Sequence, residues 1–211
     1  MEKNKVLFEA VDENGSTVKL CVKKPNEKQK RMAQLVYAKA FKEALAGGAI
    51  LRAKLSDYLI EQGLRSDDKV KKQIELMIAV SEGEKKLEDE SLSKEDKEKI
   101  ALKLKTDRQE LLNVRMPEIN LDNNTAEAFA QNEQFNYLVS CCTYTEEGVP
   151  VFKSLDDYSD KSEYDFAIKS AQKFSTIYYG LDEDFEANLP ENKFLNSLAE
   201  KEVKAEPAIS E

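Results

Sequence analysis

Apolar side chains recur three and four positions apart along most of this chain, in stretches that end at glycine or proline. The first stretch follows Lys24-Pro25, where Asn26 and Gln29 have the spacing of a helix capping box, and it ends at Gly47-Gly48. Its apolar residues are Ala33, Val36, Tyr37, Ala40, Phe41 and Ala44. Residues at this spacing share one face of a helix, so the pattern predicts an amphipathic helix. Because similar stretches begin near Ala49, at Asn124 and at Ser162, we predict a mainly α fold.

Two more stretches predict an antiparallel pair of helices. One begins at Ser66, and the other begins at Ser93 and reaches about Arg115. The apolar residues of the first are Val70, Ile74, Met77 and Ile78. At a rise of 1.5 Å per residue, two helices of about 22 residues make an arm roughly 33 Å long. Gly83 is unfavourable in a helix by roughly 1 kcal/mol relative to alanine, and residues 84–99 are almost all charged. We therefore expect the tip of this arm to project into water.

Residues 5–23 alternate in polarity on both sides of a turn sequence, Asp12-Glu13-Asn14-Gly15, which is typical of a β-hairpin. A two-residue loop would place charged side chains on both faces of the hairpin. A three-residue loop with Gly15 in the left-handed conformation instead pairs Phe8 with Leu20 and leaves one apolar face. That face contains Val6, Phe8, Ala10, Val18, Leu20 and Val22. Because an isolated hairpin is marginally stable in water, this face must pack on a helix or join another sheet.

Positive and negative charges fall in different parts of the chain. Residues 1–117 carry 25 lysines and arginines against 21 acidic residues, whereas residues 118–211 carry 7 against 20. We place a hinge at Pro117 between these parts. The prediction is a hairpin with a helical arm at 1–117, an acidic α-helical module at 118–200 and a disordered tail at 201–211.

The residue types exclude most catalytic sites. The chain has no histidine, which removes the commonest general base and zinc ligand. Cys141 and Cys142 are adjacent and cannot easily form a disulfide with each other, and Cys141 falls on an apolar stripe, which favours a buried thiol over a redox pair. The acidic cluster at 182–186 lacks the pattern of a calcium loop. We predict no catalytic residue, metal or cofactor; a carboxylate-based metal activity is the enzymatic alternative.

Charge and hydropathy also limit the partners. The net charge of −9 disfavours nucleic-acid binding, which needs a basic surface. No apolar run approaches the length of a membrane span, and the amino terminus has no apolar segment typical of a signal peptide. We expect a cytosolic protein that binds other proteins and neither nucleic acid nor membranes.

Two apolar features are candidates for partner binding. One is the hairpin face, with Phe8, Leu20 and Val22. The other is a segment near the carboxyl end, here called the apolar hook, which contains Leu189, Phe194, Leu195 and Leu198. The hook lies in polar sequence at close to helical spacing. It therefore fits either a terminal helix that docks on its own domain or an anchor for a groove on a partner.

The segment Val18-Lys19-Leu20-Cys21-Val22-Lys23-Lys24-Pro25-Asn26-Glu27, together with the helix at 28–46, resembles small tailed-bacteriophage morphogenesis proteins, in particular tail assembly chaperones. The likeness covers roughly residues 1–117 and consists of a short strand pair, a proline-marked turn and a helical body. It implies a protein without an active site that transiently covers apolar helices of tail or capsid proteins in the host cytoplasm. The alternatives are a permanent virion component, whose strands join a neighbouring sheet, and an acidic regulator that mimics nucleic acid.

Overall fold

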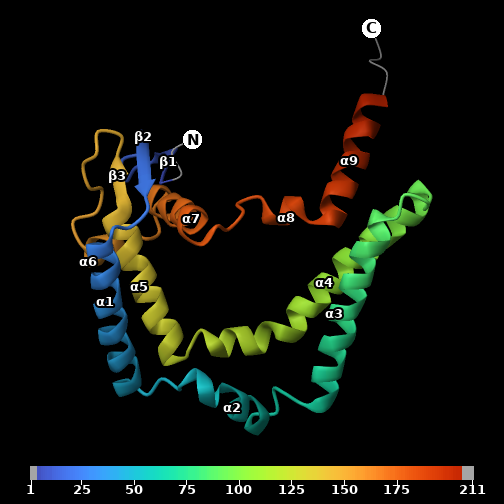
Figure 1. Ribbon diagram of the computed structural model, residues 1–211, viewed down its shortest axis with the longest axis horizontal. Coiled ribbons are helices and arrows are strands. Elements are labelled where there is room, and N and C mark those ends of the chain that lie inside the picture. The colour runs from blue at the N-terminus through green and yellow to red at the C-terminus, as the bar shows by residue number, and fades with distance from the viewer. Residues whose placement is uncertain (1–3, 206–211) are drawn as a thin grey trace. The chain divides into compact units, whose positions relative to one another are not determined.

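A computed structural model describes residues 4–205 of the chain (Figure 1). Its elements are β1 (Lys5–Val11), β2 (Thr17–Lys23), α1 (Glu27–Ala46), the 3-10 helix η1 (Arg52–Lys54), α2 (Leu55–Glu61), α3 (Asp67–Glu88), α4 (Lys94–Asp122), α5 (Ala126–Cys142), β3 (Thr143–Thr145), α6 (Leu155–Asp160), α7 (Asp165–Tyr179), α8 (Phe185–Asn188) and α9 (Pro190–Ala205). This confirms the predicted fold class, mainly α with an amino-terminal hairpin. In the predicted tail, residues 201–205 continue α9, and residues 206–211 lie outside the described residues.

The chain forms two compact units, each made from two separate stretches. Unit 1 comprises Met1–Leu55 and Asp122–Glu183, and unit 2 comprises Ser56–Leu121 and Asp184–Glu211. The predicted boundary at Pro117 does not coincide with this division. Pro117 lies inside α4 and within unit 2. A proline within a helix removes one backbone hydrogen bond and can bend the helix without ending it. Accordingly, α4 changes direction along its length in Figure 1.

The hairpin has the predicted register, and it belongs to a three-stranded sheet. Phe8 lies opposite Leu20, and Gly15 closes the loop with a φ of 81°. The third strand, β3, pairs antiparallel with β2, which gives the order β1-β2-β3 and leaves β1 and β3 at the edges. β3 has only three residues, so no alternating pattern could identify it in the sequence.

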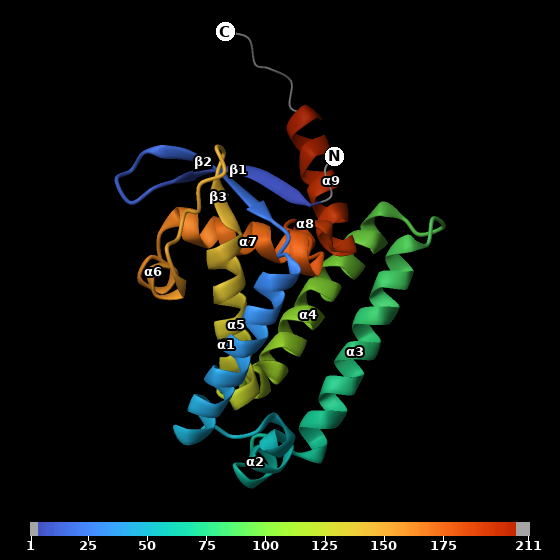
Figure 2. The ribbon, with the colours of Figure 1, turned by 60° about the vertical axis from the view of Figure 1, so that its left-hand side comes forward.

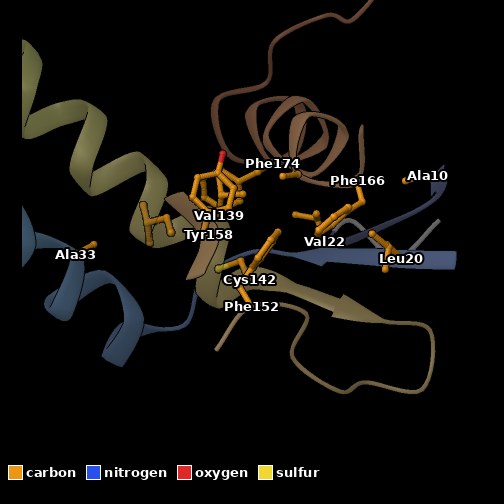
Figure 3. Packing of buried hydrophobic residues seen from close by; sticks show 12 residues of the cluster. Ala10, Leu20, Val22, Ala33, Val139, Cys142, Phe152, Tyr158, Phe166 and Phe174 are labelled. Atoms are coloured by element: carbon orange, nitrogen blue, oxygen red, sulfur yellow. The ribbon is translucent and has the colours of Figure 1, made fainter. Parts of the chain in front are cut away.

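The apolar face of the hairpin packs on α7 and on the end of α5 in unit 1 (Figure 3). The buried core consists of Ala10, Leu20, Val22, Ala33, Leu138, Val139, Cys142, Phe152, Tyr158, Phe166, Ala167 and Phe174. The Phe152 ring stacks on Phe166 at 5.7 Å and meets Tyr158 edge-on at 5.0 Å, which are favourable aromatic geometries. This core fixes the sheet against α7.

α1 and α5 lie side by side in unit 1 (Figure 2). The predicted capping box forms, with Asn26 and Gln29 bonding each other's backbone N–H groups. The Gln29 side chain also donates a 2.7 Å hydrogen bond to the Cys141 carbonyl at the far end of α5. At the opposite end of α5, the Arg52 backbone N–H in η1 donates a 2.8 Å hydrogen bond to the Glu127 carboxylate. α5 is therefore bonded at both ends to residues of the first stretch of unit 1.

The charge imbalance along the sequence is largely cancelled inside unit 1. Residues 1–55 carry 12 basic and 6 acidic residues, whereas residues 122–183 carry 4 and 12. Both stretches belong to unit 1, so the basic and acidic parts of the chain share one folded body. The charge split therefore does not separate two modules.

In unit 2, α3 and α4 run antiparallel (Figure 1). A narrow seam of apolar side chains lies between them. The seam contains Val80, Leu87, Ala101 and Leu104. Gly83 faces this seam, and a Cβ atom at Gly83 would lie 3.1 Å from Leu104 Cδ1. The expectation that this arm projects into water fails for α3 up to Leu87, because the glycine lets the α4 side chain pack directly against the α3 backbone. The residues at 88–91 and 93–96 are exposed, as expected for the tip.

Candidate protein-binding surface

α3 carries large apolar side chains on two sides. Leu76, Val80 and Leu87 are buried. Ile74, Met77 and Ile78, which belong to the stripe identified in the sequence, are 51%, 53% and 53% exposed. At about 100° per residue, these three side chains share one side of the helix, and Ile78 lies opposite the seam. We call Val70, Ile74, Met77 and Ile78 the outer face of α3.

The buried face of α3 is decided by packing and not by the number of apolar residues. Both faces have the spacing of an amphipathic stripe, so the sequence alone does not choose between them. Gly83 lies on the same side as Val80 and Leu87, where it allows Leu104 to approach. The outer face has no such gap. The signal that could have identified it was the presence of two apolar stripes on one helix, because a single neighbouring helix covers only one.

The outer face is suited to contact with another helix. Met77 at its centre is unbranched and flexible, so it can fill irregular gaps, and the isoleucines beside it add stiff apolar surface. Charged residues of both signs flank it, including Lys71, Glu75 and Glu82, all exposed. On the side toward α4, Lys72 pairs with Glu110 at 2.5 Å and helps to hold the two helices together. An apolar strip with a mixed-charge rim is typical of a surface that receives an amphipathic helix.

The predicted hairpin residues lie in the core of unit 1. Leu20 and Val22 are 3% and 0% exposed, and Phe8 is half-buried against the same core. The apolar face of the hairpin thus packs on a helix, which was one of the two predicted outcomes. In this fold, Leu20 and Val22 are not available at the surface.

The apolar hook packs within unit 2. Phe194 and Leu195 contact the seam between α3 and α4, Leu198 is buried, and Leu189 is half-buried. The structure therefore shows the docked arrangement, in which α9 covers one end of the seam. Structure and sequence agree that this segment has a buried apolar side, but the structure places that side against its own unit.

An ion-pair cluster fastens α9 to the arm. Arg108 in α4 donates hydrogen bonds to Glu191 in α9 and to Glu84 in α3. Glu191 is 1% exposed, and its second carboxylate oxygen has no hydrogen-bond partner among the residues that the structure describes. Desolvation acts to lower the pKa of Arg108, but the two carboxylates outweigh it and raise the pKa. The buried negative charge of Glu191 thus depends on Arg108 to offset the cost of its desolvation.

The adjacent cysteines are part of the packing of unit 1. Their sulfur atoms lie 3.9 Å apart, and Cys142 is 1% exposed. The neighbouring Cys141 and burial raise the pKa of the Cys142 thiol, so this thiol stays protonated. The hydrogen bond from Cys142 lowers the pKa of Cys141. Cys142 therefore behaves as a small core residue, whereas Cys141 is half-buried beside it.

Several acidic side chains of unit 1 are engaged in local contacts. Asp165 accepts hydrogen bonds from the Val11 backbone N–H at 2.8 Å and from Lys169 at 2.9 Å, and these contacts lower its pKa. Glu183 bonds Lys173, which lowers the pKa of that carboxyl group. Among the side chains described, those of residues 4–199, no three histidine, cysteine or acidic residues are grouped to hold a metal ion.

A groove of unit 1 with a volume of about 620 Å³ lies between the hairpin turn and the 145–151 loop. Its lining mixes Lys19 and Lys161 with Glu13, Glu146 and Glu147. No helix in the described part of the chain is both long and apolar enough to cross a membrane.

Among the surfaces described, the outer face of α3 offers the clearest means of recognition. A scan against protein-family models, a search of curated proteins and a search of solved structures found no match to this chain.

Proposed function

We propose that this chain is a non-catalytic protein-protein interaction protein that acts like a chaperone in bacteriophage tail assembly, in the host cytoplasm. The observation that carries the proposal is the outer face of α3, where Ile74, Met77 and Ile78 are each more than half exposed. The partner would be a tail or capsid protein that presents an apolar helix before it is assembled. The resemblance of residues 18–46 to tail assembly chaperones supports this setting.

The energetics of the outer face favour a reversible contact. Complete burial of an aliphatic side chain is worth about 1.5–3 kcal/mol, so covering the exposed halves of three gives about 3 kcal/mol. A dissociation constant of 1 mM corresponds to about 4 kcal/mol. This face alone therefore supports a weak, exchangeable complex, which suits a protein that must release its partner.

The acidic-regulator alternative has less support. Its acidic part would have to present unpaired carboxylates to a basic cleft. However, the acidic stretch 122–183 belongs to the same folded unit as the basic stretch 1–55, and Asp122 and Glu183 are paired with basic side chains. A permanent virion component remains the second candidate, because the edge strand β1 offers a site for joining a neighbouring sheet.

A capture experiment tests the proposal. The immobilised full chain is incubated with extracts of phage-infected cells, and bound proteins are identified by mass spectrometry. We expect tail or capsid proteins to be retained and the retention to be lost with the double variant Ile74→Lys, Met77→Lys. Leu102→Lys is the matched control, because Leu102 lies in α4 and is 52% exposed. All three proteins should give the same circular dichroism spectrum.

Salt and sedimentation separate the alternatives. At 1 M salt the Debye length is about 3 Å, so a complex built on apolar burial should persist, whereas a charge-based complex should dissociate. Cosedimentation of the chain with intact particles would instead indicate a permanent component. Equal retention of phage proteins by the wild type and the outer-face variant would contradict the proposed binding surface.

A further inference from the structure

β1 is an edge strand whose outward backbone groups can be assigned from the register. The Asp12 N–H donates to the Ser16 carbonyl, and the Lys24 N–H donates to the Asn4 carbonyl. In an antiparallel pair, residues alternate between those bonded across the pair and those that point away. The even-numbered residues of β1 are therefore bonded to β2, and the N–H and C=O groups of Leu7 and Glu9 point outward.

One end of this edge is closed and its middle is open. The outward Val11 N–H is bonded to Asp165 of α7 at 2.8 Å. The Leu7 side chain is 57% exposed, and Glu9 is exposed beside it. An edge strand with an exposed leucine invites pairing with another strand. The closed end at Val11 limits that pairing to the segment Lys5–Glu9.

We propose that two copies of the chain associate by antiparallel pairing of β1 with β1, centred on Leu7. In this register Leu7 lies opposite Leu7 of the second copy, and both residues present outward N–H and C=O groups. Lys5 of each copy lies opposite Glu9 of the other, so the two symmetry-related pairs join opposite charges. The backbone pattern and the charge pattern thus select the same register.

Other registers lose one of these two matches. A shift by one residue would bring residues already bonded to β2 against the new strand and would turn apolar side chains toward the solvent face. A shift by two residues keeps the backbone pattern but removes the pairs between Lys5 and Glu9. In the Leu7-centred register, Val6 of one copy lies opposite Phe8 of the other on the core side, where both are half-buried. Pairing would cover their remaining exposed surface and produce a six-stranded sheet, a common size.

A charge-exchange series tests the pairing. Sedimentation velocity of the full chain over a range of concentrations measures the dimer dissociation constant. Glu9→Lys and Lys5→Glu each place like charges opposite one another at two sites, so we expect about tenfold weaker association or more for each. The double variant Lys5→Glu, Glu9→Lys restores opposite charges and should return the dissociation constant to near the wild-type value. Lys42→Glu, on the exposed surface of α1, is the control for net charge.

Effects on folding can be separated from effects on pairing. Glu9 lies opposite Lys19 within the hairpin, so Glu9→Lys adds a like-charge pair there, whereas Lys5→Glu removes one with Lys23. The two variants should therefore differ in melting temperature but agree in weakened association.

Amide hydrogen exchange tests the backbone contact. Exchange at Leu7 and Glu9 should slow as the concentration rises, whereas Val11, already bonded to Asp165, should not change. A chain that stays monomeric at every concentration overturns the proposal. So does a dimer that responds to neither charge reversal, or one in which the Leu7 and Glu9 amides gain no protection.

Discussion

Unit 1 buries four aromatic rings between a sheet and its helices, whereas unit 2 buries a narrow seam of aliphatic side chains and a carboxylate held by one arginine. The aromatic core of unit 1 supplies a large apolar area and closely defined ring contacts. In unit 2, three large apolar side chains of α3, Ile74, Met77 and Ile78, are more than half exposed. Under the proposed function, unit 1 would provide a stable platform and unit 2 the surface for reversible binding.

The largest expected effect comes from the core of unit 1. Phe174 is completely buried, and Phe174→Ala should lower the free energy of unfolding by about 4 kcal/mol, because it removes a large side chain and leaves a cavity. Urea denaturation followed by circular dichroism measures the change. The control is Ile168→Ala in the same helix, where the side chain is 45% exposed and a loss below about 1 kcal/mol is expected. Similar losses for both variants would contradict the assigned core.

The next effect concerns the ion pair in unit 2. Arg108→Met leaves the buried Glu191 carboxylate without its partner and should cost about 3 kcal/mol. Arg115→Met, at an exposed position of the same helix, should change stability little. Adding Glu191→Met to Arg108→Met removes the unpaired charge and should recover most of the loss. If the double variant is as unstable as the single one, unit 2 does not depend on this pair.

A smaller effect is expected at the contact between α3 and α4. Gly83→Leu inserts a side chain where even a Cβ atom approaches Leu104 closely, and the overpacking should cost about 2 kcal/mol despite the better helix propensity of leucine. Glu82→Leu, one position earlier and exposed, keeps a similar helix propensity without this clash and loses only a long surface pair with Lys86. Thermal melting should therefore rank Gly83→Leu well below the wild type and Glu82→Leu close to it. The reverse order would place Gly83 away from the seam.

The smallest effect depends on pH. The Val11 N–H and Lys169 lower the pKa of Asp165 in the folded protein, so its ionised form stabilises the fold above the ordinary aspartate pKa. This stabilisation is lost as the pH falls through the lowered pKa. Asp165→Asn should thus melt at a lower temperature than the wild type near pH 7, and the difference should shrink below about pH 3. A difference that stays constant with pH would rule out this contribution.

Some of this fold could be predicted because the responsible interactions are local. The register of the hairpin follows from Gly15 and from the need to keep one face apolar, and Asn26 with Gln29 marks the start of α1. The first residue of α5 was less certain. Asn124 and Thr125 both have side chains suited to capping a helix, and in the structure Thr125 is the cap. Local chemistry thus predicts that an element exists more reliably than its first residue.

The sequence by itself determined that the chain is mainly helical, that a hairpin with one apolar face opens it, and that histidine chemistry is absent. These conclusions depend on residue type and on spacing within one element. Only the tertiary structure decided which face of α3 is buried, that residues 1–55 join residues 122–183 in one unit, and that the hook packs on its own arm. Each of these outcomes depends on contacts between residues far apart in the chain, such as Gly83 with Leu104 and Arg108 with Glu191. Periodicity within one helix carries no information about which distant partner is present.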